Sequence, residues 1–415
     1  MLYLKNILQL LKNKNLYLIF ASIIISRQLV NSIEKSIINR EKKYAIICVP
    51  GLFNCGLFKL DKMTQTYKNV FLNKIDDIYS TITNKENLQK KINIIECSQN
   101  GIPLKKTVQP IEKDQIFKIS EPNDRATARY GINMIFKKII HEIKQMLKDN
   151  EKYKVYMFNY DWRLSVKTNG EKLAEEINKY DKVILIGFSL GGLISSYSFT
   201  KLYNKNQLHK IKGFIACGVP FLGSSDAVYF LFDKIDISEI LSLYASLAMR
   251  ITVPSDNIIT LQKIVKNMQS IYDLLPHQIL NTKEANTNFL PINDLINTKL
   301  IQNAKNVYNE IYENEFKWWK QIDNIYVIYG DSYKTRANVI WSKDNNKGVY
   351  TSEYGDDTVT IKSAYPEFLK QHAKGVYEVH KTKHRDLLNN NNVKKKIIQY
   401  IKTILKIETN NTKVE

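Results

Sequence analysis

Residues 182–194 constrain the fold of this chain more than any other segment. An apolar stretch, KVILIGF, runs into Gly187-Phe188-Ser189-Leu190-Gly191 and then into a helix-forming run, GLI. A G-x-S-x-G motif between a buried strand and a helix is typical of a sharp turn that lifts a serine hydroxyl above a sheet edge. Glycine on both sides of the serine avoids clashes with the strand and the helix. A helix N-cap would explain Ser189 but not both glycines, so we expect a nucleophile.

Apolar runs alternate with helix-like periodicity along much of the chain. This alternation predicts an α/β fold with a mostly parallel sheet covered by helices on both faces. We assign residues 42–58, 125–225 and 322–407 to this core. The predicted strands are Tyr44–Val49, residues 155–158, Lys182–Phe188, Ile211–Cys217 and residues 324–330, and the predicted helices are residues 126–148, 171–178, 194–203 and 393–407.

Two segments interrupt the alternation. Residues 59–122 are polar, rich in lysine and asparagine, and weakly periodic, which indicates an insertion on the core. Residues 226–320 are helix-prone and rich in aromatic and leucine side chains, which favours a cap inserted into the core. Apolar helices beside a serine nucleophile suit a site that receives apolar chains. An ordinary packed subdomain fits the same pattern equally well.

The first 30 residues predict a targeting segment. Lysines precede an apolar run at residues 16–25, a pattern typical of a secretory signal or a signal anchor. An amphipathic surface helix is the alternative, because about ten apolar residues fall short of a membrane span. We therefore expect a protein of the secretory pathway, secreted or membrane-associated.

The amino-acid composition restricts the classes of binding partner that we expect. The formal net charge is +20, from 61 Lys and Arg against 41 Asp and Glu. Such an excess favours an anionic partner such as a membrane surface, although abundant Asn and Ile indicate that compositional drift contributes. The chain has no zinc-finger spacing and no compact arginine-rich arm, so we do not expect nucleic acid as a partner.

The four cysteines include no C-x-x-C pair, so no zinc site is expected. Cys48 belongs to an apolar run and is predicted to be a buried thiol. Cys55 and Cys97 flank the polar insertion, and the sequence leaves open whether they pair in an oxidising compartment.

A nucleophilic serine needs a base within hydrogen-bond reach, and histidine is the usual one. Sheet hydrolases place the acid and then the histidine after the serine in the chain. His384, on a polar loop before the last helix, is the best candidate, because a late loop can overhang the sheet edge. His380 and His372 remain alternatives.

The acid and the oxyanion hole follow from the same logic. Asp356, directly after Gly355, is the preferred acid, with Asp357 and Asp331 as alternatives. Two backbone N–H groups must face the developing oxyanion. We expect them from Leu190 and from Leu52, in the loop after the first strand.

Six segments together resemble the lecithin:cholesterol acyltransferase family, which includes lysosomal phospholipase A2 and the phospholipid:diacylglycerol acyltransferases. They are VPGLF at 49–53, YDWRL at 160–164, GFSLGG at 187–192, GVPFLGS at 218–224, GDDTV at 355–359 and HRDLL at 384–388, in the family's order. The resemblance implies an α/β-hydrolase core with an inserted helical cap and a lid or membrane-binding insertion at residues 59–122. It also implies Ser189 as nucleophile, Asp356 as acid, His384 as base, and the amides of Leu52 and Leu190 as the oxyanion hole.

The resemblance implies the activity too. It points to cleavage of phospholipid esters through an acyl-serine at a bilayer surface, and the basic charge of the chain favours anionic bilayers. The acyl acceptor would be water, a sterol or a glyceride, and no cofactor or metal is implied. The alternatives are a soluble carboxylesterase acting on smaller esters and a non-catalytic lipid-binding homologue.

Two details of the resemblance concern individual residues. Phe53 is the second choice of oxyanion donor and, with Trp162, a candidate substrate-binding residue. The motif at Asp161-Trp162-Arg163 implies either head-group contact or bracing of its loop, and we favour bracing. The family's early disulfide spans a shorter interval than Cys55 to Cys97, so an unpaired state would mean a differently built lid.

Overall fold

The computed structural model describes residues 43–52, 54–55, 58–61, 66–69, 85–105, 134–148, 150, 152–232, 265–280, 297–312, 318–342 and 347–406. The chain divides into two compact units, Met1–Lys43 and Tyr44–Glu415, and the second is described below. The predicted targeting segment, residues 1–30, lies outside the described residues. None of the described helices is long and apolar enough to cross a bilayer.

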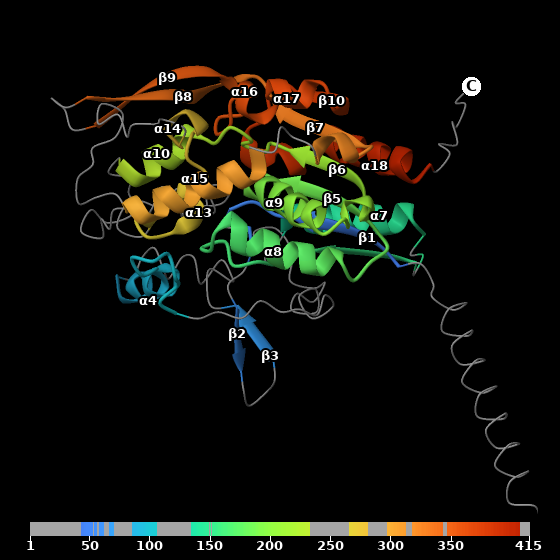
Figure 1. Ribbon diagram of the computed structural model, residues 1–415, viewed down its shortest axis with the longest axis horizontal. Coiled ribbons are helices and arrows are strands. Elements are labelled where there is room, and N and C mark those ends of the chain that lie inside the picture. The colour runs from blue at the N-terminus through green and yellow to red at the C-terminus, as the bar shows by residue number, and fades with distance from the viewer. Residues whose placement is uncertain are drawn as a thin grey trace, which may run out of the picture. The chain divides into compact units, whose positions relative to one another are not determined.

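A six-stranded sheet forms the centre of the described chain (Figure 1). All neighbouring strands in it are parallel, in the order β10-β7-β6-β5-β1-β4. The predicted parallel sheet is therefore confirmed. The strands are β1 (Tyr44–Val49), β4 (Tyr153–Met157), β5 (Lys182–Phe188), β6 (Ile211–Cys217), β7 (Ile325–Gly330) and β10 (Ala373–Val379).

The strand order reverses at β1. The chain passes from β1 to β4 at one edge and then returns to β5 on the other side of β1, with Val49 in register with Gly187. In open α/β sheets, ligands bind outside the carboxyl ends of the strands at such a reversal. The loop after β1 and the turn after β5 therefore meet where a site is expected.

Helices cover both faces of the sheet, as the sequence pattern predicts. Ala45, Ile47 and Val49 of β1 pack in one apolar cluster with α8 (Val166–Ile177) and α9 (Leu190–Asn204). Ile46 and Cys48 pack in a second cluster with α7 (Met134–Met146) and α18 (Asn391–Leu405). Burial on both faces explains why this strand is continuously apolar rather than alternating.

The described part of the predicted cap is helical and shares the main core. It holds α10 (Ser225–Phe232), α13 (Gln269–Tyr272), α14 (His277–Leu280) and α15 (Thr298–Tyr312). Trp318 and Trp319, fully buried and stacked with ring centroids 4.1 Å apart, pack against Phe199 of α9 and Phe214 of β6. These aromatic side chains consequently stabilise the central sheet and α9.

Several elements were not predicted. A long antiparallel hairpin, β8 (Tyr333–Ser342) and β9 (Lys347–Gly355), separates β7 from the acid loop. Two short helices, α16 (Ile361–Ala364) and α17 (Glu367–Lys370), follow that loop. The described parts of the 59–122 insertion include β3 (Thr66–Asn69), which pairs with β2 (Phe58–Asp61), and α4 (Lys85–Ile95).

Candidate active site

The turn after β5 holds Ser189 in a strained conformation. Its φ of 52° and ψ of −127° lie in a region that L-residues rarely adopt. A Cβ added at Gly191 would lie 2.1 Å from the carbonyl oxygen of Val49, and one at Gly187 would lie 2.8 Å from the Cα of Gly192. Only glycine allows the strand, the turn and helix α9 to approach this closely. The sequence motif is therefore a true strand–turn–helix elbow.

The two residues expected to form the oxyanion hole, Leu190 and Leu52, lie on separate elements next to Ser189. Leu190 is the first residue of α9, and the first N–H groups of a helix have no intrahelical partner. Leu52 lies in a turn closed by the N–H of Asn54, which donates to the carbonyl oxygen of Gly51 at 3.2 Å. Gly51 lies against the elbow, since a Cβ there would be 3.0 Å from the Cβ of Ser189.

A hydrogen bond from Tyr160 holds the loop after β1. The hydroxyl of buried Tyr160 donates to the carbonyl oxygen of Pro50 at 2.6 Å. This bond fixes the loop that carries Leu52, and nothing in the sequence predicts it beyond the tyrosine of the YDWRL motif. Phe53, the second candidate donor and a candidate substrate contact, lies outside the described residues.

Asp356 and His384 come together although 28 residues separate them in the sequence. The Nδ1 of His384 lies 2.7 Å from the Oδ2 of Asp356, whose side chain is 1% exposed. The Oδ1 of Asp356 accepts from the N–H groups of Thr358 at 3.1 Å and Val359 at 2.7 Å. A carboxylate satisfied in this way orients the imidazole with its proton on Nδ1, which leaves Nε2 as the basic nitrogen.

The imidazole of His384 stands at the carboxyl ends of β5 and β6. It stacks on Phe188, the residue before Ser189, with ring centroids 5.0 Å apart. On another side it packs on the backbone of Gly218, where an added Cβ would lie 3.1 Å from the Nδ1 and Cε1 atoms. The structure therefore places His384 at the elbow, with Gly218, of the GVPFLGS motif, against its ring.

The alternative acids and bases lie in other settings. Asp331 pairs with His380 at 2.6 Å, but the side chain of His380 is 73% exposed. Asp357 pairs with Lys383 at 2.7 Å and adopts a φ of 83°. Only the pair of Asp356 and His384 is buried among these candidates, and it is the pair whose imidazole contacts the residue before Ser189.

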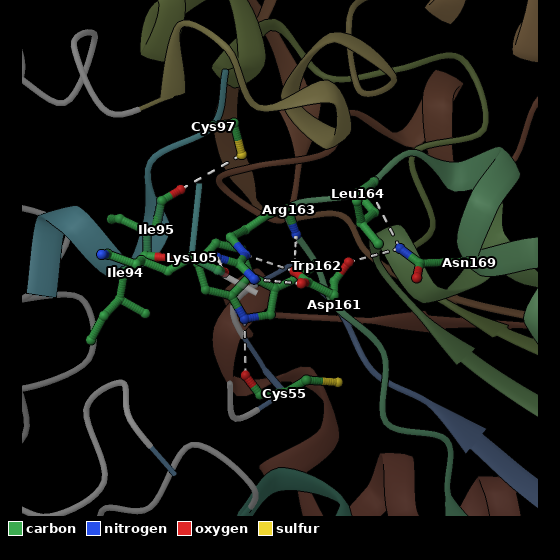
Figure 2. A network of polar contacts seen from close by, with 10 residues as sticks. All are labelled: Cys55, Ile94, Ile95, Cys97, Lys105, Asp161, Trp162, Arg163, Leu164 and Asn169. Carbon is green, nitrogen blue, oxygen red and sulfur yellow. Dashed lines mark hydrogen bonds and ion pairs between the residues drawn. The ribbon is translucent and has the colours of Figure 1, made fainter. Parts of the chain in front are cut away.

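The buried side chain of Arg163 connects residues 94–105 with the loop after β4 (Figure 2). Its side chain is fully buried, and its Nη2 pairs with the Oδ2 of Asp161 at 2.5 Å. Its Nη1 donates to the carbonyl oxygens of Ile94 and, at 3.1 Å, of Lys105. The ion pair thus ties residues 94–105 to the loop after β4, as the bracing hypothesis for this motif requires.

Trp162 does not fit the substrate-binding role that we considered for it. Its side chain has no exposed surface, and its indole N–H donates to the carbonyl oxygen of Cys55 at 2.9 Å (Figure 2). A ring enclosed by protein on every side has no face for a substrate in this conformation. The physical reason is the close packing of the loop after β4 against the segment around Cys55.

All four cysteines are free and buried, including Cys55 and Cys97, which do not pair. Burial raises the pKa of the Cys55 thiol to about 12 and that of Cys97 to about 12. Bonds from Trp162 and Arg163, rather than a disulfide, connect this region to the core. Among the described residues, no group of three His, Cys, Asp or Glu side chains is placed to hold a metal ion.

One family model matches part of this chain. The family model described as lecithin:cholesterol acyltransferase matches residues 123–237, less than half of the chain but including the elbow and the Asp161–Arg163 motif. The predicted family is confirmed over this segment. No curated protein sequence gives a significant match.

Three solved structures are similar to this chain at low sequence identity. A chain of the Tle4–Tli4 complex is 11% identical with a TM-score of 0.51, over 88% of this chain and 99% of that one. Bacillus licheniformis lipase BlEst2 is 14% identical with a TM-score of 0.34, over 60% of this chain and 80% of its own. A monoacylglycerol lipase of Paleococcus ferrophilus is 15% identical with a TM-score of 0.33, over 65% of this chain and 88% of its own. The chain has an α/β-hydrolase fold.

Proposed function

Since residues 123–237 belong to the lecithin:cholesterol acyltransferase family, we propose that this protein is a phospholipase A or O-acyltransferase that uses Ser189 to cleave phospholipid esters. The family and the fold support the broader class, a lipid acyl-ester hydrolase or acyltransferase. The observation that carries the proposal is the buried pair of Asp356 and His384 at 2.7 Å, stacked on Phe188 beside the strained serine.

In the first half-reaction, the Oγ of Ser189 attacks the ester carbonyl while Nε2 of His384 takes the hydroxyl proton. Asp356 holds the imidazole and stabilises the imidazolium. The amides of Leu52 and Leu190 stabilise the oxyanion of the tetrahedral intermediate. As that intermediate collapses, the lysolipid alcohol leaves with the proton from His384, and the acyl group remains on Ser189 as an ester.

In the second half-reaction, an acceptor hydroxyl attacks the acyl-serine and His384 again moves the proton. Water as acceptor releases a fatty acid, whereas a sterol or glyceride hydroxyl yields a new lipid ester. The same residues serve both outcomes. The choice depends on whether the site holds the acceptor hydroxyl and excludes water.

The proposed setting is a bilayer surface. The net charge of +20 favours docking to anionic lipid, and the basic and apolar N-terminal pattern favours the secretory pathway, with a secreted or membrane-associated product. We propose no cofactor, because the serine, histidine and aspartate account for each bond and proton in both half-reactions.

The test is product analysis on acyl-labelled phosphatidylcholine vesicles, with and without cholesterol or diacylglycerol. We expect Ser189→Ala to lower turnover by about 10⁴-fold or more, while Ser198→Ala, further along the same helix, retains it. Free fatty acid alone would identify a phospholipase, and labelled sterol ester or triacylglycerol an acyltransferase. Turnover that survives Ser189→Ala would refute the proposal, and turnover of short soluble esters alone would favour a carboxylesterase.

A further inference from the structure

A cavity of about 300 Å³ lies beside the loop that carries Asp356, and the proposed mechanism does not use it. Residues 222–225, the start of α14, the β8–β9 hairpin and residues 360–363 form its walls. The volume is at the lower end for ligand pockets and suits a small polar group. Its lining includes hydroxyl, amide and charged side chains, which offer hydrogen-bond and ionic partners to a polar group.

The cavity shares a wall with the acid loop. The hydroxyl of Ser224, which lines the cavity, donates to the carbonyl oxygen of Thr358 at 2.7 Å. The N–H of Thr358 in turn donates to the Oδ1 of Asp356 at 3.1 Å. A group bound in the cavity is therefore two hydrogen bonds away from the acid that orients His384.

Two cations with unused donors line the cavity. The Nη1 of Arg336 donates to the Oδ1 of Asp226 at 2.8 Å, and its guanidinium lies 4.0 Å from the ring centroid of Tyr229. Among the described residues, the other N–H groups of Arg336 have no hydrogen-bond partner, and neither has the ammonium of Lys362. A guanidinium fixed by a carboxylate and an aromatic ring is preorganised to bind an anion through its free edge.

One carboxylate, that of Glu353, lies on the same cavity. A simple anion would be attracted by Arg336 and Lys362 and repelled by Glu353. A zwitterion satisfies all three, because its anionic end can meet the two cations while its cationic end meets the carboxylate. The charge pattern therefore selects a phosphate group joined to an amine or quaternary ammonium.

We propose that this cavity binds the phosphate of a zwitterionic group, with Arg336 and Lys362 on the phosphate and Glu353 on the cationic end. A phospholipid head-group is the source that the proposed function would supply, and to that extent this inference rests on it. Free phosphate is the other source of the same anionic chemistry. Recognition here would favour phospholipids over neutral glycerides as acyl donors.

The experiment is calorimetric titration of the full-length protein with sn-glycero-3-phosphocholine, inorganic phosphate and glycerol. We expect glycerophosphocholine to bind and glycerol not to bind. Arg336→Lys, which keeps the charge beside Asp226 but loses the fork, and Lys362→Gln should each weaken binding by about tenfold. Lys395→Gln, an exposed lysine on α18, should leave it unchanged.

Glu353→Gln separates the two sources. If the ligand is a lipid head-group, this variant should bind glycerophosphocholine more weakly than the wild type does, and should bind inorganic phosphate equally well or more tightly. Inorganic phosphate that binds more tightly than glycerophosphocholine in the wild type would keep the anion site and assign it to free phosphate. The proposal would be overturned if neither compound bound, or if Arg336→Lys and Lys362→Gln both bound glycerophosphocholine as tightly as the wild type does.

Two controls keep the result clear. The double variant Asp226→Asn/Arg336→Gln removes the ion pair without leaving a buried carboxylate, so it tests the fork even if Arg336→Lys is unstable. Labelling of Ser189 by a fluorophosphonate reports the proposed function separately. Labelling without phosphate binding would remove this inference alone, and phosphate binding without labelling would remove the function alone.

Discussion

Gly218 sets the position of the imidazole of His384 from the end of β6. Its φ is +55°, and an added Cβ would lie 2.9 Å from the Cδ1 of Leu387 and 3.1 Å from the His384 ring. Any side chain at this position must displace the histidine, the leucine or the backbone. In the proposed mechanism, Gly218 acts through His384 and does not touch the reacting atoms.

We expect Gly218→Ala to lower kcat/KM on phosphatidylcholine vesicles by about 10- to 100-fold, because a small shift of a base is costly to proton transfer. The fluorophosphonate labelling rate of Ser189 should fall in parallel. At Gly213, within β6, an added Cβ comes closest to the flexible end of Ile404, at 2.5 Å, and lies 3.3 Å from the carbonyl oxygen of Asn324, so Gly213→Ala should keep its labelling rate. Equal losses in both variants would mean a general loss of stability instead.

Asp273 gives the fold a dependence on pH. Its carboxylate accepts from the N–H of Val166 at 2.6 Å and from the amide of Gln269 at 2.9 Å. Burial nevertheless raises its pKa to about 7. The protonated form is therefore favoured by folding, so its stabilising contribution is complete below about pH 4 and is lost as pH rises through about 7.

Asp273→Asn should remove this dependence. Relative to wild type, the free energy of unfolding of the variant should rise by about 2 kcal/mol between pH 5 and pH 8, a value reduced for partial access of solvent. Urea unfolding at several pH values measures it. Asp323→Asn, at an exposed carboxylate, is the control and should show no such trend, whereas a flat difference for Asp273→Asn would contradict the burial argument.

At the scale of elements, the loop after β4 is held by the ion pair of Asp161 and Arg163. Removing only one of these two buried charges should destabilise the fold strongly. Arg163→Met would leave Asp161 buried without its cation and would free the carbonyl oxygens of Ile94 and Lys105. We expect a loss of about 3–5 kcal/mol in the free energy of unfolding, as for other broken buried pairs. Urea denaturation with circular dichroism detection measures this loss.

Two variants calibrate that measurement. Asp161→Asn/Arg163→Met should be less destabilised than Arg163→Met, because no buried charge remains unpaired. Lys167→Ala removes an ion pair with Glu310 whose side chains are 45% and 33% exposed, so it should cost about 1 kcal/mol or less. If Arg163→Met lowered the free energy of unfolding as little as Lys167→Ala does, the contacts of Arg163 would not contribute measurably to stability.

The elements predicted best from sequence are those whose burial leaves a simple pattern. β1 is a continuous apolar run, β6 is apolar apart from Lys212 and Gly213, and both have the expected bounds. α8 begins at Val166, five residues before the predicted start at residue 171, because Ser165 caps it by accepting from the N–H of Thr168. The edge strand β10 contains Lys374, Gly375 and Glu378, which hide it from any apolar pattern.

The candidate site shows the same division. The local motif predicts the elbow of Ser189, and chain order predicts an aspartate and a histidine after it. The contacts that bring them together are tertiary: at Gly330, at the end of β7, an added Cβ would lie 2.7 Å from the Cβ of Asp356. The β8–β9 hairpin, whose strands mix charged and apolar residues, gave no periodic signal, so the cavity that it helps to form was invisible in the sequence.

For the whole molecule, the excess of positive charge predicts how membrane binding should respond to salt. Binding to vesicles that contain phosphatidylserine should weaken steeply between about 50 and 500 mM NaCl, because the Debye length shortens over that range. Sedimentation with sucrose-loaded vesicles measures it, with pure phosphatidylcholine vesicles as the control. Binding that is equal for both lipids at low salt would indicate that the charge of +20 reflects composition alone.

The four buried thiols supply the molecule with its own reporters of local unfolding. A thiol that is enclosed and protonated reacts with an alkylating reagent only when its surroundings open. Cys48 and Cys217 lie on central strands, whereas Cys55 and Cys97 lie beside the segments held by Trp162 and Arg163. Mass spectrometry of the labelled peptides over time would therefore follow two regions of one unmodified chain, and the order in which they open would emerge without introducing a probe.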